Sequence, residues 1–427
     1  MVICHFVFAL GLALPLGLAS PRPVAQQARS TRARFTWGAI GDSWGSGVGY
    51  DILGRTDYDG NKDQCLRINH AYSVQVHQDQ SWVPENKVQD FSFTACSGAR
   101  LVNMAAEPFN GYIQMNEVGT QPDIVTMQAG GNDAGFYNVA SSCIFHDNLR
   151  DYGPVWPSPD GDCVKAIDAA RSFVNDRTRK FTSDTVADIL DHDSVKINPN
   201  FRLYVIGYAH FFNVDDGSTW CNDQTFSLFW NTQAQPQKLL LGLRRSINDL
   251  VEILNQQIQR AVDDFKDRGV GYIDITKRFD GGRFCETNHT LLDQYWGNNV
   301  MLWNASPEGV VLNINGNYSV RDPTENEMNN WLQTGKFTNG PNEVSAQSPV
   351  SGPIQGTSPG VALRPFHPKE NGHGKVADAI IARLKADIGG EKSPPVCEVA
   401  YGQDIEACIA GCKRGKCNNS NLLNIIC

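Results

Sequence analysis

Residues 35–47 have the sequence FTWGAIGDSWGSG. The first six are mostly apolar and predict a short buried strand, and the glycines that follow predict a sharp turn. This turn places Ser43 directly beyond the carboxyl end of the strand. In an open sheet of parallel strands, that edge is where ligands bind. The stretch therefore predicts the start of an α/β fold with a serine at its ligand-binding edge.

Similar apolar runs recur along the chain, and helical patterns separate them. Strands are predicted over residues 35–40, 88–93, 123–129, 201–207 and 270–274. Apolar residues at three- and four-residue steps predict helices over residues 165–190, 237–268 and 373–388. Near-continuous apolar strands that alternate with helices indicate a parallel sheet covered on both faces. The predicted fold class is α/β, a three-layer α/β/α sandwich with a central parallel sheet.

The serine turn has two interpretations when it is taken alone. Residues 41–45 match G-x-S-x-G, the nucleophile elbow of α/β-hydrolases. That fold builds several strands before its elbow, whereas Ser43 follows the first predicted strand. By itself, the motif is better interpreted as a plain glycine and serine loop.

Three further blocks favour a functional interpretation of this loop. They have the sequences CSGAR at residues 96–100, GGND at 130–133 and RPFHPKENGH at 364–373. Each block follows a predicted strand or precedes a predicted helix. A parallel sheet brings the carboxyl ends of its strands to one edge, so we expect all four blocks to meet there.

The four blocks, in this order and at similar separations, resemble those of the SGNH/GDSL hydrolase superfamily over about residues 35–390. GDSW, GGNDAGF and HPKENGH are most similar to the secreted, disulfide-bonded esterases and lipases of actinobacteria and their fungal relatives. The resemblance implies a carboxylic ester hydrolase that uses neither a metal nor an organic cofactor. It implies that Ser43 is the nucleophile and His367 the general base. The implied oxyanion hole consists of the backbone N–H groups of Ser43 and Gly98 and the side-chain amide of Asn132.

These residue types suit ester hydrolysis through an acyl-enzyme. A serine hydroxyl is a poor nucleophile until a neighbouring imidazole takes its proton. The tetrahedral intermediate carries negative charge, and removal of one preorganised donor costs about 3 to 4 kcal/mol. Gly98 lets its own N–H approach the substrate without a side chain in the way. Asn132 supplies a neutral amide donor.

One position departs from the family pattern. Most members carry an aspartate three residues before the histidine, and here that position is Arg364. Its guanidinium cannot accept a proton or orient an imidazole. Some secreted relatives use a main-chain carbonyl at this position, so we expect the carbonyl of Arg364 to accept the Nδ1–H of His367. This arrangement predicts a Ser–His dyad, and an acidic side chain from elsewhere in the chain is the alternative.

His373, Asp42 and Asp133 are rival candidates for catalytic roles. His373 lies at the start of the last predicted helix and is interpreted as a capping or core residue. Asp42 and Asp133 follow glycine turns and are expected to accept hydrogen bonds from loop N–H groups. The remaining histidines share no ligand spacing and predict no metal site; they are His70, His77, His146, His192, His210 and His289.

Cysteine usage indicates export, because eleven cysteines after the first 20 residues are far more than a cytosolic enzyme usually carries. In the related secreted esterases, neighbouring cysteines along the chain are paired. The resemblance thus implies three disulfides, Cys65–Cys96, Cys143–Cys163 and Cys221–Cys285. The other five cysteines lie within residues 397–427, and the odd total leaves one without an assigned partner. Four N-x-S/T sequons mark candidate glycosylation sites at Asn288, Asn304, Asn317 and Asn418.

The chain is predicted to begin with an export signal and to end in an appendage. Residues 1–20 form an apolar run that ends in small residues, as in a signal peptide. The run lacks a basic start, so a membrane anchor is the alternative. Residues 21–34 are predicted to be a linker or propeptide and residues 35–390 the hydrolase domain. Within that domain, residues 295–361 are predicted to be an irregular insertion that could cover the site. Residues 391–427 are predicted to be a Cys-rich C-terminal appendage.

Charge and composition limit the partners. The chain has 37 Lys plus Arg against 46 Asp plus Glu, which argues against nucleic acid as a ligand. No stretch after the leader is apolar enough for a stable membrane span. We expect a secreted, extracellular esterase or lipase whose partner is an ester substrate: a lipid, a small ester or an acetylated polysaccharide. A carbohydrate deacetylase of the acetyl-xylan type and a non-catalytic secreted binding protein are the alternatives. The oligomeric state is not predicted.

Overall fold

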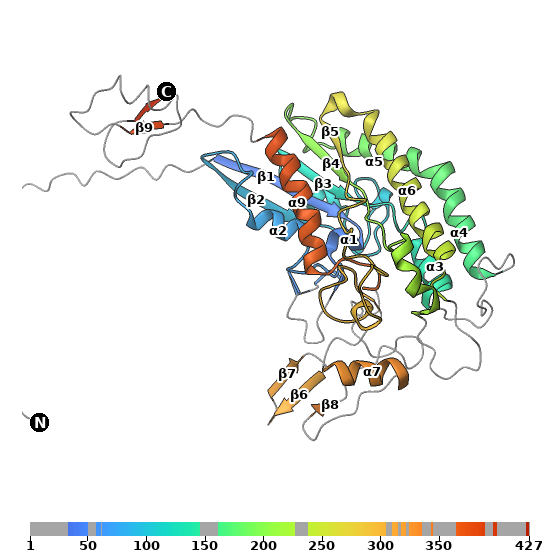
Figure 1. Ribbon diagram of the computed structural model, residues 1–427. Coiled ribbons are helices and arrows are strands. Elements are labelled where there is room, and N and C mark those ends of the chain that lie inside the picture. Colours follow the sequence, from blue (N-terminus) through green and yellow to red (C-terminus); the bar gives the residue numbers. More distant parts are fainter. Residues whose placement is uncertain are drawn as a thin grey trace, which may run out of the picture.

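The architecture is that of a computed structural model, which describes residues 33–49, 57–60, 62–145, 161–226, 238–304, 310–314, 317–321, 324–334, 343–344, 364–388, 396–398 and 424–426. Its centre is a five-stranded parallel sheet with strand order β2-β1-β3-β4-β5 (Figure 1). The strands are β1 (Ala33–Gly41), β2 (Lys87–Phe93), β3 (Ile124–Gln128), β4 (Arg202–Ile206) and β5 (Val270–Ile273). The predicted α/β class with a central parallel sheet is confirmed.

Helices cover both faces of this sheet, as Figure 1 shows. On one face, α2 (Tyr72–Gln78) packs against α9 (Glu370–Asp387). On the other face, α4 (Asp162–Phe173), α5 (Arg179–Asp191) and α6 (Leu241–Asp263) pack together. Helix α6 lies on the sheet because its buried apolar residues recur at three- and four-residue steps. They include Leu243, Ile247, Leu250, Val251, Leu254 and Ile258.

Strand β1 lies where the strand order reverses. It pairs with β2 on one side and with β3 on the other, and Gly41 at its end faces Gln128 of β3. In a sheet of this order, the crevice outside the carboxyl ends of these strands is the usual ligand site. Ser43 opens the short helix α1 (Ser43–Ser46) at this point.

All five predicted strands and all three predicted helices are present, with ends shifted by a few residues. The helix predicted over 165–190 is α4 and α5 joined by a π-helical stretch, Val174–Thr178. The one predicted over 237–268 ends at Asp263, and the chain turns into β5 at Gly269, which has a φ of 80°. Helix α2 and the short helical segments were not predicted from the sequence. These are α1, α3 (Phe136–Ala140), the π-helical turn Ser141–Phe145, and the 3-10 turns Leu101–Asn103, Gln114–Glu117, Asp216–Asp223, Lys266–Arg268 and Leu292–Gln294.

The segment 295–361 is not irregular throughout, so that prediction is wrong for its described part. Strands β6 (Val310–Ile314), β7 (Asn317–Arg321) and β8 (Glu343–Val344) form a small antiparallel sheet, and α7 (Glu325–Thr334) follows β7. These short strands lie in a stretch dense in Asn, Gly, Pro and Ser, a composition typical of loops. The overlooked signal is Asn315-Gly316, a dipeptide typical of tight hairpins, between two such strands. Met328 of α7 is fully buried in the core.

The ends of the chain are described only in part. In the predicted C-terminal appendage, β9 (Val396–Glu398) pairs antiparallel with β10 (Asn424–Ile426). The predicted signal peptide and most of the predicted linker lie outside the described residues, and β1 begins at Ala33. Among the residues that the structure describes, no helix combines the length and apolar character that crossing a bilayer requires.

Candidate active site

The structure brings Ser43 and His367 into hydrogen-bond contact. Ser43 follows β1, and His367 lies in the segment that leads into α9. Nε2 of His367 is 2.6 Å from Oγ of Ser43. This is the distance that transfer of a proton from the hydroxyl to the imidazole requires.

The turn that presents Ser43 is fixed by backbone contacts at Gly41. Gly41 has a φ of 156°, and a Cβ there would lie 2.5 Å from the carbonyl oxygen of Gln128. The buried amide of Gln114 bonds Gly41 twice, accepting from its N–H at 2.7 Å and donating to its carbonyl at 2.9 Å. The N–H of Asp42 donates to the carbonyl of Gln128 at 2.9 Å. These bonds hold the end of β1 and thereby the start of α1.

Two main-chain carbonyls orient the His367 ring. Nδ1 lies 3.1 Å from the carbonyl oxygen of Arg364 and 3.1 Å from that of Pro365. Because a carbonyl can only accept, Nδ1 carries the hydrogen, and the lone pair of Nε2 faces Ser43. Burial lowers the pKa of His367 to about 4, and the two carbonyls partly offset this effect. The imidazole is therefore neutral and able to take a proton at pH 7.

The residues predicted to form the oxyanion hole lie on loops that follow β2 and β3. Gly98 has a φ of 90°, which favours glycine, and a Cβ there would lie 3.3 Å from the ring of Phe109. Nδ2 of Asn132 donates to the carbonyl of Ala99 at 2.9 Å. This bond joins the loop of Asn132 to the residue beside Gly98. It uses one of the two amide hydrogens of Asn132.

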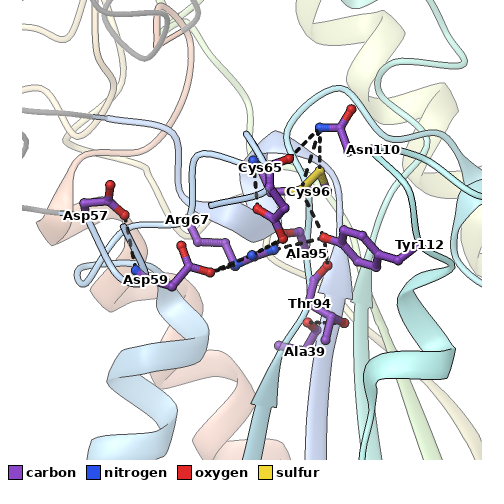
Figure 2. A network of polar contacts seen from close by, with 11 residues as sticks. Ala39, Asp57, Asp59, Cys65, Arg67, Thr94, Ala95, Cys96, Asn110 and Tyr112 are labelled. Carbon is purple, nitrogen blue, oxygen red and sulfur yellow. Dashed lines mark hydrogen bonds and ion pairs between the residues drawn. A yellow bond between two sulfur atoms is a disulfide. The ribbon is translucent and has the colours of Figure 1, made fainter. Parts of the chain in front are cut away.

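A disulfide between Cys65 and Cys96 ties down the loop that carries Gly98 (Figure 2). The N–H of Ser97 donates to the carbonyl of Cys65 at 3.0 Å. The hydroxyl of Tyr112 lies 3.0 Å from Sγ of Cys65 and donates to the carbonyl of Thr94 at 3.1 Å. The structure also contains the other two expected disulfides, Cys143–Cys163 and Cys221–Cys285. The cysteines after Cys285 are not among the disulfides described.

Behind this disulfide lies a buried arginine that the sequence analysis did not identify. Arg67 is 3% exposed and binds Asp59 through Nε at 2.9 Å and Nη2 at 2.6 Å, and Nη2 also binds Asp63. Nη1 donates to the carbonyl of Ala95 at 3.1 Å and to the hydroxyl of Tyr112 at 3.0 Å. Figure 2 shows the guanidinium between Asp59 and Tyr112. Arg67 thus anchors the main chain that leads to Gly98.

The segment around His367 is held by Trp303, from the insertion. The carbonyl of Trp303 accepts from the N–H of Phe366 at 2.7 Å, and its N–H donates to the carbonyl of His367 at 2.8 Å. The guanidinium of Arg364 lies 4.5 Å from the centre of the Trp303 ring, and Nζ of Lys369 lies 5.4 Å from it. Burial lowers the pKa of Lys369 to about 7, and the charge of Arg364 lowers it further. The Arg364 side chain therefore faces Trp303, whereas the main-chain carbonyl of Arg364 accepts from Nδ1 of His367.

The three rival candidates lie where the sequence analysis expects them. Both aspartates accept loop N–H groups: Oδ1 of Asp42 from Trp44 at 2.9 Å, and Oδ2 of Asp133 from Leu101 at 3.0 Å. Burial raises the pKa of Asp42 to about 7 and also raises that of Asp133. His373 is fully buried within α9, and burial lowers its pKa to about 3. Within the described ranges, no three His, Cys, Asp or Glu side chains form a cluster that could hold a metal ion.

Two of the four sequons can be judged from their side chains. Asn304 is fully buried, so a glycan on it does not fit the folded chain, and that candidate is withdrawn. The cause is its place beside Trp303, in the segment that packs against residues 366–369. Asn288 is exposed. Asn317 lies in β7, and Asn418 lies outside the described residues.

Comparison with known proteins identifies bacterial lipases as relatives. No family model matches the chain. The chain is 30% identical over 176 residues to a lipase of Streptomyces rimosus, which covers 41% of this chain and 53%, about half, of that protein. It is 27% identical over 296 residues to Lipase 1 of Streptomyces coelicolor, covering 68% of this chain and 88% of that one. The predicted resemblance to actinobacterial lipases is confirmed.

Two solved structures are also similar to this chain. The extracellular lipase of Streptomyces rimosus has a TM-score of 0.48 at 19% identity, covering 82% of this chain and 98% of that chain. A phospholipase A1 from Streptomyces albidoflavus has a TM-score of 0.43 at 24% identity, covering 63% of this chain and 92% of that chain.

Proposed function

We propose that this chain is an exported carboxylic ester hydrolase of the SGNH type, an esterase or lipase that acts through an acyl-enzyme on Ser43, in agreement with its similarity to Streptomyces lipases. The observation that carries the proposal is the 2.6 Å contact between Nε2 of His367 and Oγ of Ser43. Nδ1 of the same ring meets the carbonyls of Arg364 and Pro365. The base is thus oriented without a carboxylate, and the proposed machinery is a Ser–His dyad.

The first half of the reaction acylates Ser43. Nε2 of His367 takes the hydroxyl proton while Oγ bonds to the ester carbonyl carbon. The negative charge that forms on the carbonyl oxygen is assigned to the N–H groups of Ser43 and Gly98 and to the second amide hydrogen of Asn132. When the tetrahedral intermediate collapses, the protonated His367 gives its proton to the departing alcohol. The acyl group remains on Oγ of Ser43.

The second half releases the acid. His367, neutral again, takes a proton from a water molecule as that water attacks the acyl carbonyl. The same donors stabilise the second tetrahedral intermediate, and His367 returns the proton to Oγ of Ser43. Because burial holds the pKa of His367 low, the ring releases each proton readily to the leaving oxygen.

An apolar acyl chain is the favoured substrate class. Tyr137 lies five residues beyond Asn132, at the start of α3, and its side chain is 67% exposed. Val102 lies four residues beyond Gly98 and is 37% exposed. These exposed apolar side chains lie close along the chain to Gly98 and Asn132 and support the choice of a lipid or small apolar ester over a sugar. Deacetylation of a carbohydrate is the alternative outcome of the test below.

Export is part of the proposal. The three disulfides of the described chain would not persist in a reducing cytosol. We therefore place the protein outside the cell, in agreement with the leader-like residues 1–20.

The test compares wild type with Ser43→Ala on p-nitrophenyl esters of rising chain length and on acetylated xylan. We expect wild type to prefer chains longer than acetate and Ser43→Ala to lose at least about 10³-fold in kcat. Release of acetate from xylan, with no preference among the p-nitrophenyl esters, would establish the deacetylase. Equal rates for the two proteins would favour a non-catalytic binding protein.

A further inference from the structure

A buried hydroxyl connects the serine turn to the Asn132 turn. Tyr208 lies two residues beyond the end of β4, and its side chain is 4% exposed. Its hydroxyl donates to Oδ2 of Asp42 at 2.6 Å and accepts from the N–H of Gly131 at 3.1 Å. Both partners are immediate neighbours of residues to which the proposed function gives chemical roles.

On one side, the bond acts through Asp42 on Ser43. Oδ1 of Asp42 accepts from the N–H of Trp44, so the carboxylate spans Ser43 and caps the first turn of α1. Fixing Oδ2 with a second hydrogen bond fixes the rotation of this carboxylate. The direction of the Ser43 N–H and the position of Oγ depend on that cap.

On the other side, the bond acts through Gly131 on Asn132. The N–H of Gly131 points at the tyrosine oxygen, and Asn132 follows directly. The Asn132 amide then reaches the carbonyl of Ala99, beside Gly98. One hydroxyl thus lies between the nucleophile and the two loops that carry the other oxyanion donors.

Tyr208 is itself held rigidly. The side-chain amide of Asn255 accepts from the N–H of Tyr208 and donates to its carbonyl, both at 2.8 Å, and also donates to Oγ1 of Thr276 at 2.9 Å. The ring of Trp44 packs edge-on against the Tyr208 ring at 5.4 Å. Because both its backbone and its ring are held, Tyr208 can position the Asp42 carboxylate and the Gly131 N–H that its hydroxyl contacts.

We propose that Tyr208 is a positioning residue, whose hydroxyl sets the distance between the Ser43 nucleophile and the oxyanion donors on the neighbouring loops. This inference rests on the proposed function. Burial keeps the hydroxyl protonated, because it raises the pKa of Tyr208 well above its ordinary value. The bond to Asp42 therefore retains its donor throughout the working pH range.

The chain offers a matched control in Tyr204. Tyr204 is also buried and donates to a carboxylate, Asp387, at 2.8 Å. Asp387 is the last residue of α9, and Glu370, beside the active-site segment, is the first. The two ends are about 25 Å apart along the helix. Tyr204→Phe therefore removes the same chemical group from the same strand region without touching the site.

The experiment measures kcat and KM for p-nitrophenyl butyrate, and inhibition by a boronic acid that forms a tetrahedral adduct with serine. We expect Tyr208→Phe to lower kcat by about 10- to 100-fold with KM nearly unchanged. The inhibition constant of the boronic acid should rise in proportion, and inhibition by butyrate should not change. Tyr204→Phe should keep kcat within about twofold at a similar loss of melting temperature. Asp42→Asn, which reverses the donor direction, should repeat the effect if Tyr208→Phe does not fold.

The outcomes separate this inference from the proposed function. A Tyr208→Phe enzyme whose kcat and boronic acid affinity match those of Tyr204→Phe, while Ser43→Ala is inactive, would overturn the positioning role alone. Wild-type rates no higher than those of Ser43→Ala would overturn the proposed function and the positioning role with it.

Discussion

Nε2 of His367 lies 2.6 Å from Oγ of Ser43, although 324 positions separate the two residues in the chain. The contact depends on a short antiparallel pairing in which Trp303 and Met301 bind the segment of the histidine. The N–H of Trp303 donates to the carbonyl of His367 at 2.8 Å. The N–H of Lys369 donates to the carbonyl of Met301 at 2.7 Å. The imidazole is therefore placed by backbone hydrogen bonds on both sides of its own residue.

Activity is predicted to persist in acid. In the proposed reaction the working form of His367 is the neutral ring, and burial lowers the pKa of His367 to about 4. A lowered pKa means that the ring takes up its inactivating proton only near pH 4, instead of near the ordinary value of about 6.5. The acid limb of kcat/KM should therefore lie near pH 4 in a profile measured from pH 3.5 to 8. Burial raises the pKa of Asp42 to about 7, so a limb at pH 6.5 or above would contradict the buried, neutral base only if it persists in Asp42→Asn.

The side chain of Arg364 is predicted to be dispensable for chemistry. Arg364→Met keeps the carbonyl that faces Nδ1 of His367 and fills most of the buried volume. We expect kcat within about threefold of wild type and a loss of about 1 to 2 kcal/mol in the free energy of unfolding, because the contact with Trp303 is removed. His367→Gln removes the proposed general base and is the reference variant, with an expected loss of about 10⁴-fold in kcat. A comparable loss in Arg364→Met would show that its guanidinium takes part.

Much of the fold and of the site could be predicted from local patterns. Strands β1, β3, β4 and β5 are largely buried apolar runs with turn residues at their ends, so each is visible in a short window. Ser43, Gly98, Asn132 and His367 each stand in a recognisable block, and strand order brings the first three to one edge. The resemblance to secreted relatives predicts the carbonyl of Arg364 as the partner of His367, and the structure places it 3.1 Å from Nδ1.

The supporting residues could not be found in this way. Gln114 holds Gly41 across 73 positions, and Tyr208 reaches Asp42 across 166. A single glutamine or tyrosine outside the main helices and strands has no local sequence signal of such a role, because its partner is adjacent only after the sheet has formed. The small sheet of β6, β7 and β8 was missed for a different reason: its short strands lie in a stretch dense in Asn, Gly, Pro and Ser, which is typical of loops.

The disulfides are predicted to differ in their effect on activity. Cys65–Cys96 closes a loop of 31 residues and Cys143–Cys163 one of 20, so removing either should cost about 3 kcal/mol of unfolding free energy. Only the first lies on the loop of Gly98, so Cys65→Ala/Cys96→Ala should also lower kcat about tenfold. Unfolding in urea and kcat for p-nitrophenyl butyrate give the two values.

The second double variant, Cys143→Ala/Cys163→Ala, is the control for that comparison. It should lose similar stability and keep kcat within about twofold. Equal losses of kcat in the two double variants would mean that reduced stability, and not a displaced oxyanion loop, explains the first result.

Arg67 is predicted to be the most sensitive charged residue in the described chain. Arg67→Met leaves the carboxylates of Asp59 and Asp63 facing each other with their shared cation removed. Breaking a buried ion pair from one side typically costs about 3 to 5 kcal/mol. We expect a loss of this size in urea unfolding, with a fall in kcat because the carbonyl of Ala95 loses its donor. Arg34→Met, which breaks an exposed pair with Asp90, should cost no more than about 1 kcal/mol.

A rescue variant distinguishes the loss of the Arg67 hydrogen bonds from the cost of leaving two buried carboxylates without a cation. Arg67→Met combined with Asp59→Asn and Asp63→Asn removes all three charges, so the repulsion and the desolvation of the carboxylates disappear together. Stability should then recover by about 1 to 3 kcal/mol relative to Arg67→Met. The bonds from Arg67 to Ala95 and Tyr112 remain absent, so kcat should stay low. Recovery of kcat alongside stability would show that Arg67 acts on the site only by balancing charge, whereas recovery of stability alone supports its role as an anchor of the Gly98 loop.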